Sequence, residues 1–258
     1  LSQSLNAPEI VSMLSGGKVA DDSLLATFPE GFTLAQICER LAAGNVPSGA
    51  TLAEAKIADY EVQYKFLKDA PPDNNLEGFL FPDTYRFLSD DTKERIIKKF
   101  LDNFDKKLTP NLREETSKQE SKIYDVLILA SIVQQEAQSE SEMPRLAGIF
   151  INRLRAGMLL QSDATVNYAT GKKLRQATLE DIKIKSPYNT YLNVGLPAGP
   201  ISNPGLAAIR AAIYPESTDY FYFFHPVDGP TVFSRTLDEH NKNRQKYLNV
   251  PLPKLPLR

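Results

Sequence analysis

Hydrophobic and polar residues recur at helical spacing in several stretches of the chain. Between residues 91 and 108 the apolar side chains share one face and lysines cover the other, which predicts an amphipathic helix. Similar spacing predicts helices over residues 34–43, 51–67, 121–137, 142–156, 201–214 and 237–248, and a shorter amphipathic segment over 5–18. Apolar runs predict strands over residues 24–28, 220–224 and 231–234, with the last two paired as a hairpin around Asp228-Gly229. Because helices and strands mix without β-α-β alternation, the predicted fold class is α+β.

Helix-end signals support two of these helices. Thr33 is suited to be the N-cap of the helix over 34–43, and Gly44 its C-cap. Pro144 falls in the first turn of the helix over 142–156, and Gly157 follows its end. These residues therefore set the predicted limits of both helices.

A polar, proline-rich segment over residues 69–75 predicts a boundary between two units, residues 1–73 and 74–258. The first unit reads as strand, helix, helix and strand, a pattern common in small binding modules. A chain of 258 residues has room for one large domain or for a large and a small one.

Composition narrows the function classes. With 42% hydrophobic and 24% charged residues the chain is an ordinary globular protein. A formal net charge of −2 gives no global basic character of the kind typical of nucleic-acid-binding proteins. A single cysteine, Cys38, excludes an intrachain disulfide, and two histidines give no expectation of a metal site. No apolar run approaches the roughly 18 residues of a membrane span, but the chain starts at Leu1 rather than Met, so we expect an upstream segment that includes an anchor.

Glu136 is the most informative residue for chemistry. It follows Val133 and Ile132 by three and four positions, so its carboxylate falls on an apolar helix face. Burial raises the pKa of a carboxyl group, and a carboxyl that stays protonated near neutral pH can act as a general acid. The alternative is a structural glutamate that reaches solvent or pairs with Arg145 or Arg153.

Two further carboxylates carry open alternatives. Glu77 lies between Leu76 and an aromatic cluster, where it either positions a ligand or binds backbone amides in a turn beside Gly78. Asp163 follows Gln161 and Ser162, and is either a site residue or a helix cap.

Other signals favour structure over catalysis. The pattern predicts that His225 belongs to the hairpin and that Cys38 belongs to the core. The chain has no phosphate-binding loop, dinucleotide motif or nucleophile elbow. Five aromatic residues suit either a groove for sugar rings or the core, namely Phe81, Tyr85, Tyr168, Tyr188 and Tyr191.

Several motifs in series resemble the MltG (YceG-like) family of endolytic murein transglycosylases. They are LASIVQQE ending at Glu136, IFINRL over 149–154, GMLLQSDATV over 157–166 and LEGFLFPDTY over 76–85. Later matches are SPYNTY over 186–191, GLP over 195–197, NPG over 203–205, and the Phe233-Ser234 and DEHN (238–241) blocks. The likeness extends from about Phe28 to Tyr247. One departure is Gln134, which stands where the family motif has an acidic residue.

The resemblance implies a LysM-like subdomain over 1–73, incomplete here, and a catalytic domain over 74–258. It implies a bacterial protein held to the membrane by one N-terminal helix that is absent from this sequence, with the catalytic domain outside the cytoplasm. The expected substrate is the peptidoglycan glycan strand, the expected partners are penicillin-binding synthases, and no cofactor is expected.

The resemblance also assigns Glu136 as the catalytic residue. It would protonate the MurNAc–GlcNAc β-1,4 bond and then deprotonate the MurNAc C6 hydroxyl, which leaves a 1,6-anhydro end. We expect substrate-binding roles for Glu77, Asn152, Gln161, Ser162, Asp163, Tyr188 and Asn189. The alternatives are a hydrolase that uses Glu77 or Asp163 as a second carboxylate, a non-catalytic glycan-binding scaffold, and a pyridoxal-phosphate lyase, for which no lysine has a suitable context.

Overall fold

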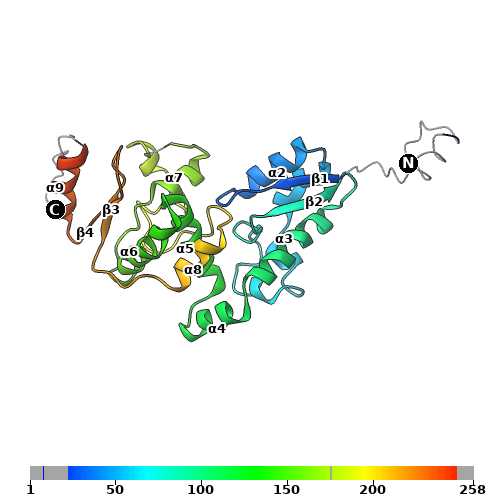
Figure 1. Ribbon diagram of the computed structural model, residues 1–258, viewed down its shortest axis with the longest axis horizontal. Helices are drawn as coiled ribbons and strands as arrows, with labels where there is room; N and C mark the ends of the chain where they lie inside the picture. Colours follow the sequence, from blue (N-terminus) through cyan, green and yellow to red (C-terminus); the bar gives the residue numbers. More distant parts are fainter. Residues whose placement is uncertain (1–7, 9–22, 175, 249–258) are drawn as a thin grey trace.

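The computed structural model describes Pro8 and residues 23–174 and 176–248, so the predicted segment over 5–18 lies largely outside the described residues. The molecule is elongated (Figure 1), with a lobe of β1, β2, α2 and α3 at one end, a helical middle of α5, α6, α7 and α8, and β3, β4 and α9 at the other end. This mixture of helices and strands confirms the predicted α+β class.

The elements have the following bounds. The strands are β1 (Ser23–Thr27), β2 (Thr84–Leu88), β3 (Tyr222–Phe224) and β4 (Val232–Ser234). The α-helices are α2 (Leu34–Ala43), α3 (Lys93–Lys107), α4 (Pro110–Lys118), α5 (Ile123–Glu136), α6 (Met143–Arg155), α7 (Asp163–Thr170), α8 (Leu206–Ile213) and α9 (Leu237–Leu248). The 3-10 helices are η1 (Pro47–Glu54), η2 (Ile57–Asp59), η3 (Lys65–Leu67), η4 (Glu140–Glu142) and η5 (Asp181–Lys183).

In the first lobe, β1 and β2 form an antiparallel pair that runs from Ser23 opposite Leu88 to Thr27 opposite Thr84. Alternate residues of this pair face the core, where Phe87 packs at 6.0 Å from the ring of Phe28. Because β2 pairs with β1 across residue 73, the predicted boundary between residues 73 and 74 does not coincide with a break in the sheet. The division into two domains stays a prediction.

The helix predicted over 51–67 is wrong. The chain forms the 3-10 helices η1, η2 and η3 there instead of an α-helix. Tertiary hydrogen bonds explain the difference, since the Ile57 and Ala58 amides donate to the carbonyls of Asn74 and Pro72 rather than to a preceding turn. Apolar side chains in this stretch still reach the core.

The helical middle is built around α5, whose residues from Val126 to Val133 are all buried. α6 and α8 pack against it. A helix segment that is buried on all sides has no solvent face of its own, as expected for a nearly continuous apolar run. The predicted helix over 201–214 begins only at Leu206, because the Ile201 amide bonds to Ser131 Oγ at 3.0 Å and the Gly205 amide to Gln134 Oε1 at 2.9 Å.

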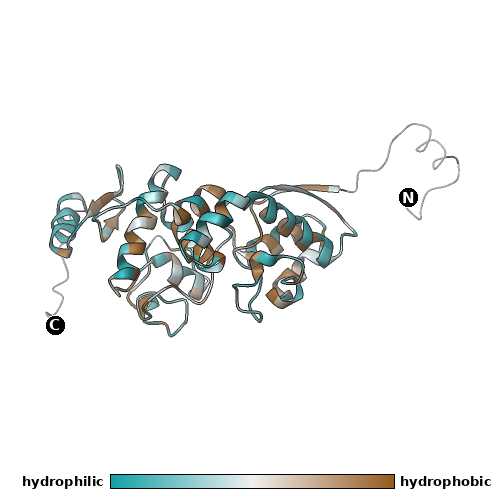
Figure 2. Ribbon diagram, turned by 90° about the horizontal axis from the view of Figure 1, so that it is seen from below, coloured by the Kyte–Doolittle hydropathy of each residue, from teal (hydrophilic) through white to brown (hydrophobic). Residues whose placement is uncertain are grey.

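The remaining helix and strand predictions agree with the structure to within a few residues. α2 has Thr33 as N-cap and Gly44 as C-cap, as predicted. β2, α4 and α7 were not predicted from the pattern. Figure 2 shows that α9 is mostly hydrophilic, which agrees with its lack of buried residues. Among the described helices, none has the length and apolar character needed to cross a bilayer.

Candidate functional site

An open groove of about 1960 Å³ crosses the molecule from the start of α2 to β3 and α9. The end of α5 and the start of α7 contribute Glu136 and Asp163 to its lining, between these two ends. Sites for small molecules are typically about 300–1,000 Å³, so the groove has the dimensions of a polymer site.

Glu136 is the last residue of α5 and is partly buried in this groove. Ser162 Oγ donates a hydrogen bond of 2.5 Å to its Oε1 atom. Ser162 is the N-cap residue of α7, so the carboxyl group of Glu136 faces the N-terminal end of that helix. The end of one helix and the start of another therefore hold the carboxyl between them.

Burial is the main cause that raises the pKa of Glu136 above its ordinary value, and the neighbouring charge of Asp163 raises it further. The Ser162 hydroxyl, the Ala164 amide and the Arg153 charge act in the opposite direction and are outweighed. The protonated form of Glu136 is thus favoured at higher pH than for a glutamate in water. That property is the one a general acid requires.

The loop before α8 fixes the start of α7. Thr190 Oγ1 accepts from the Ser162 amide at 3.0 Å, and the Thr190 carbonyl accepts from the Gln161 amide at 3.1 Å. Tyr191 donates its hydroxyl to Asp163 Oδ1 at 2.7 Å. These bonds fix Ser162 and its two neighbours, Gln161 and Asp163. Because Ser162 binds the Glu136 carboxyl group, the position of that group depends on this loop.

Glu77 is a second buried carboxylate, with 4% of the residue exposed. The Leu34 amide at the start of α2 donates to both of its oxygens, at 2.9 and 3.1 Å. Asn203 Nδ2 donates to Oε1 at 2.9 Å, and the Tyr168 hydroxyl of α7 donates to Oε2 at 3.1 Å. Burial raises the pKa of Glu77 to about 7 despite these bonds. Glu77 thus ties together α2, α7 and the segment before α8.

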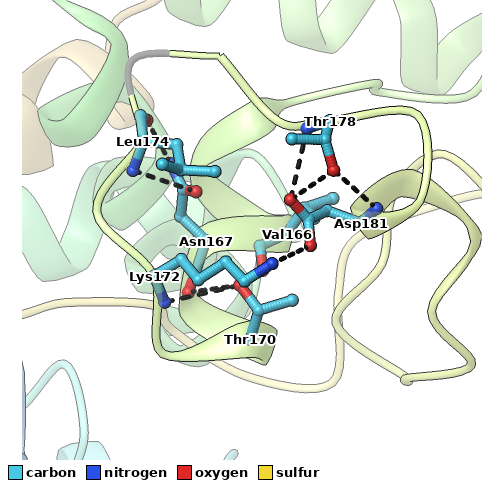
Figure 3. Close-up of polar contacts among 7 residues, drawn as sticks. All are labelled: Val166, Asn167, Thr170, Lys172, Leu174, Thr178 and Asp181. Atoms are coloured by element: carbon cyan, nitrogen blue, oxygen red, sulfur yellow. Dashed lines mark hydrogen bonds and ion pairs between the residues drawn. The ribbon is translucent and has the colours of Figure 1, made fainter.

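A separate polar cluster anchors the chain that follows α7 (Figure 3). Lys172 Nζ pairs with Asp181 Oδ1 at 2.5 Å, and Thr178 Oγ1 donates to Asp181 Oδ2 at 2.7 Å. The Lys172 ammonium holds the pKa of Asp181 below its usual range. Asn167 Nδ2 donates to the Leu174 carbonyl at 2.7 Å, so α7 itself fastens the segment beside the groove.

The structure brings together some of the predicted site residues. Glu136, Glu77, Gln161 and Asp163 line the groove, and Ser162 bonds directly to Glu136. Glu77 accepts from a backbone amide, as in the structural alternative, but the amide that donates to both of its oxygens belongs to Leu34 of α2 rather than to its own turn.

Four predicted residues do not line the groove: Ser162, which contacts Glu136 from behind the lining, and three residues without a bond to Glu136. Asn152 donates to the carbonyls of Thr218 and Tyr220, and Asn189 is fully buried and donates to two carbonyls of its own loop. Tyr188 packs on Tyr168 with ring centroids 4.9 Å apart. Contact of these three with a substrate stays a prediction, and their observed bonds support the walls of the groove.

Sequence reasoning missed Arg153 and Thr190 as site residues, whereas Tyr191 was one of the five aromatic residues suited to a groove for sugar rings, and it lines the groove. Arg153 was considered only as an ion-pair partner of Glu136, and Arg145, the other candidate partner, pairs with Glu216 at 2.9 Å. The available signal in the sequence was an arginine in the last turn of an amphipathic helix. The structure shows that this arginine is buried. Within the described residues no group of three or more His, Cys, Asp or Glu side chains is placed to bind a metal ion.

Comparisons with known proteins identify relatives of this chain. The chain is 40% identical over 174 residues to the endolytic murein transglycosylase of Bacillus subtilis (strain 168). This alignment covers 67% of the chain and 48% of that protein. It is 31% identical over 278 aligned positions to the endolytic murein transglycosylase of Streptococcus pneumoniae serotype 2 (strain D39 / NCTC 7466), covering 98% of the chain and 50% of that protein. The chain thus spans about half the length of the curated relatives that it matches.

A solved structure has the same fold. The crystal structure of a putative yceG-like protein, lmo1499 from Listeria monocytogenes, superposes with a TM-score of 0.77 at 37% sequence identity, covering 94% of this chain and 83% of that one. The sequence pattern of the YceG-like family matches residues 1–246. The chain therefore belongs to the YceG-like family.

Proposed function

We propose that this chain carries the catalytic site of an endolytic lytic transglycosylase that cleaves the MurNAc–GlcNAc β-1,4 bond of peptidoglycan strands. The observation that carries the proposal is Glu136, a carboxyl group with a raised pKa that lines a large open groove. The names of the two relatives support the same class of reaction. A groove open to solvent suits a strand that enters sideways and is cut internally.

In this mechanism Glu136 first donates its proton to O4 of the GlcNAc leaving group as the bond from MurNAc C1 breaks. The resulting carboxylate then accepts the proton of the C6 hydroxyl of the same MurNAc, whose oxygen bonds to C1. The product is a 1,6-anhydro end, no water is consumed, and Glu136 returns to its protonated form. One carboxyl group in two successive roles replaces the pair used by most glycosidases.

Ser162 assists this cycle through a hydrogen bond, and Asp163 assists it through its negative charge. The Ser162 hydroxyl supports the carboxylate that exists between the two proton transfers, because it donates to Oε1. Asp163 places a negative charge near Glu136, which favours the protonated acid before cleavage and would stabilise positive charge that develops at C1.

A two-carboxylate hydrolase is the second candidate, because Asp163 lies near enough to Glu136 to raise its pKa. Glu77 is less suited to the role of second catalytic carboxylate, since protein donors already engage both of its oxygens. In the hydrolase, Asp163 would activate a water molecule rather than stabilise charge.

Mass spectrometry of un-cross-linked glycan strands tests the proposal, with the chain and its Glu136→Gln variant compared. We expect internal cuts with anhydro ends, each lighter by one water than a hydrolysed end, and no cuts by the variant. Hydrolysed ends would establish the second candidate. Anhydro ends from the Glu136→Gln variant at the normal rate would refute the role of Glu136, and binding without cleavage by either protein would indicate a scaffold.

Membrane anchoring through a segment upstream of this sequence, an extracytoplasmic location, a LysM-like role for the first lobe and contact with penicillin-binding synthases belong to the same proposal. Their support is the family membership alone.

A further inference from the structure

The groove continues past Glu136 to an end formed by β3 and α9, and this end has an unusual charge distribution. Arg153, Tyr222, His240 and Arg244 line it. The acidic residues of the groove lining are Glu39, Glu77, Glu136 and Asp163, which belong to α2, the segment before β2, α5 and α7. The β3–α9 end therefore contributes cationic side chains without acidic ones.

Arg153 is held rigidly in this region. It is 6% exposed, its Nε atom donates to the Phe221 carbonyl at 2.7 Å, and Nη1 donates to the Leu160 carbonyl at 2.6 Å. Its guanidinium carbon lies 5.3 Å from the centroid of the Tyr222 ring. Within the described residues no carboxylate lies within ion-pair distance of Arg153, and its hydrogen bonds go to neutral carbonyls, although the charge of Glu136 acts on it from farther away.

Arg244 adds a second positive charge on α9. The acidic residues of that helix bond elsewhere, since Asp238 pairs with Lys242 at 2.7 Å and Glu239 accepts from the Arg235 amide at 2.8 Å. In the part of the chain that the structure describes, Arg244 has no carboxylate within ion-pair distance. Its charge is available to a ligand in the groove.

His240 lies between the aromatic rings and the arginines. Its ring is 5.4 Å from that of Tyr222, and its Nδ1 atom is buried without a hydrogen-bond partner among the described residues. Burial, together with the charges of Arg244 and Arg153, lowers the pKa of His240 to about 4. The imidazole is thus neutral at pH 7, and it neither adds to nor removes the positive charge.

We infer that the β3–α9 end of the groove binds a carboxylate that projects from the glycan strand, with Arg244 as the principal contact and Arg153 and Tyr222 beside it. The inference rests on the proposed function. The sugar backbone of murein offers hydroxyl and amide groups, whereas the peptide attached to its MurNAc residues offers carboxylates. Guanidinium groups bind carboxylates through paired, charge-assisted hydrogen bonds. The site would therefore favour strands whose peptide carboxylates are free.

Binding measurements in the Glu136→Gln background test this inference without turnover. The probes are one preparation of fluorescently labelled, un-cross-linked glycan strands with their peptides, and a second portion in which a carbodiimide and ammonia have converted the peptide carboxylates to amides. We expect this amidation to weaken binding about tenfold, the size of effect that one charge-assisted contact supplies. We expect Arg244→Gln to weaken binding of the strands with free carboxylates by a similar factor and to leave binding of the amidated strands unchanged.

Lys246→Gln is the matched control, because it removes one positive charge from the same helix at a residue that does not line the groove. Arg244→Lys keeps the charge and should retain part of the binding. Equal effects of Arg244→Gln and Lys246→Gln would overturn the inference, and so would an equal loss with both kinds of strand. Thermal unfolding of each variant separates a folding defect from a binding defect, and cleavage by the unmutated chain tests the proposed function independently.

Discussion

Glu77 and Glu136 are two carboxylates of one groove with different surroundings. Three protein groups on three segments donate hydrogen bonds to the oxygens of Glu77. Glu136 has one side-chain donor, Ser162, and is partly exposed in the groove. Burial raises the pKa of both groups. The comparison teaches that a raised pKa alone does not identify a catalytic acid, because the group must also keep an oxygen free for the substrate.

The largest expected effect is on turnover. Glu136→Gln should lower the rate of strand cleavage by about 10³-fold, within the range that general acid–base catalysis supplies. Glu77→Gln should cost far less, because the amide can accept from the Leu34 amide and Asn203 and donate to the Tyr168 hydroxyl. Initial rates on the same strands measure both. Equal losses of cleavage rate in the two variants would contradict the distinction between a catalytic Glu136 and a structural Glu77.

The next effect is on stability. Glu77→Ala leaves the Leu34 amide and the Asn203 side chain without their buried acceptor, so we expect unfolding to become easier by about 3 kcal/mol. Urea unfolding at pH 7 measures this change. Glu39→Ala is the control, because it removes an exposed glutamate of α2 that also lines the groove, and surface changes usually stay within about 0.5 kcal/mol. A similar loss in both variants would contradict the role of Glu77 as a buried tie.

Stability should also depend on pH through Glu77. Its pKa is higher in the folded chain, about 7, than the 4.5 of an exposed glutamate, so the folded state binds the proton more tightly. The resulting stabilisation is present below about pH 4.5 and is lost as the pH rises through about 7, with an upper size of about 3 kcal/mol.

Urea unfolding at pH 5 and pH 8 measures this dependence. Glu77→Gln should flatten the curve over that interval, because the variant has no proton to lose. An unchanged pH dependence in the variant would show that other groups cause it, and Glu136 is then the first to test, since its pKa is raised as well.

The smallest effect concerns Ser162. Ser162→Ala removes the hydroxyl that lowers the pKa of Glu136, so the alkaline limb of the activity profile should move to higher pH. The rate at its optimum should fall about tenfold, as for one charge-assisted hydrogen bond. Ser217→Ala, at an exposed serine, is the control. An alkaline limb that stays in place would mean that another group sets it.

Local patterns predicted much of the fold. α2, α3, α5, α6 and α9 follow their apolar spacing and capping residues, because these signals act within a few residues of chain. The stretch over 51–67 has helical spacing too, but hydrogen bonds to Pro72 and Asn74 replace the helix there. α7 escaped prediction because it is short and its start is held by Thr190, which lies 28 residues after Ser162.

The candidate site divides in the same way. The sequence by itself singled out Glu136 as a candidate, because a carboxylate among apolar residues of one helix is visible as a local pattern, and the resemblance to the family added the catalytic role as an expectation. Only the tertiary structure decided which groups meet it. Ser162, Asp163 and Arg153 reach Glu136 from other segments, and the donors around Glu77 come from up to 126 residues away. A pKa depends on burial and on the charges nearby in space. Contacts between distant segments of the chain, rather than the local sequence, therefore determine which carboxylate is free to react.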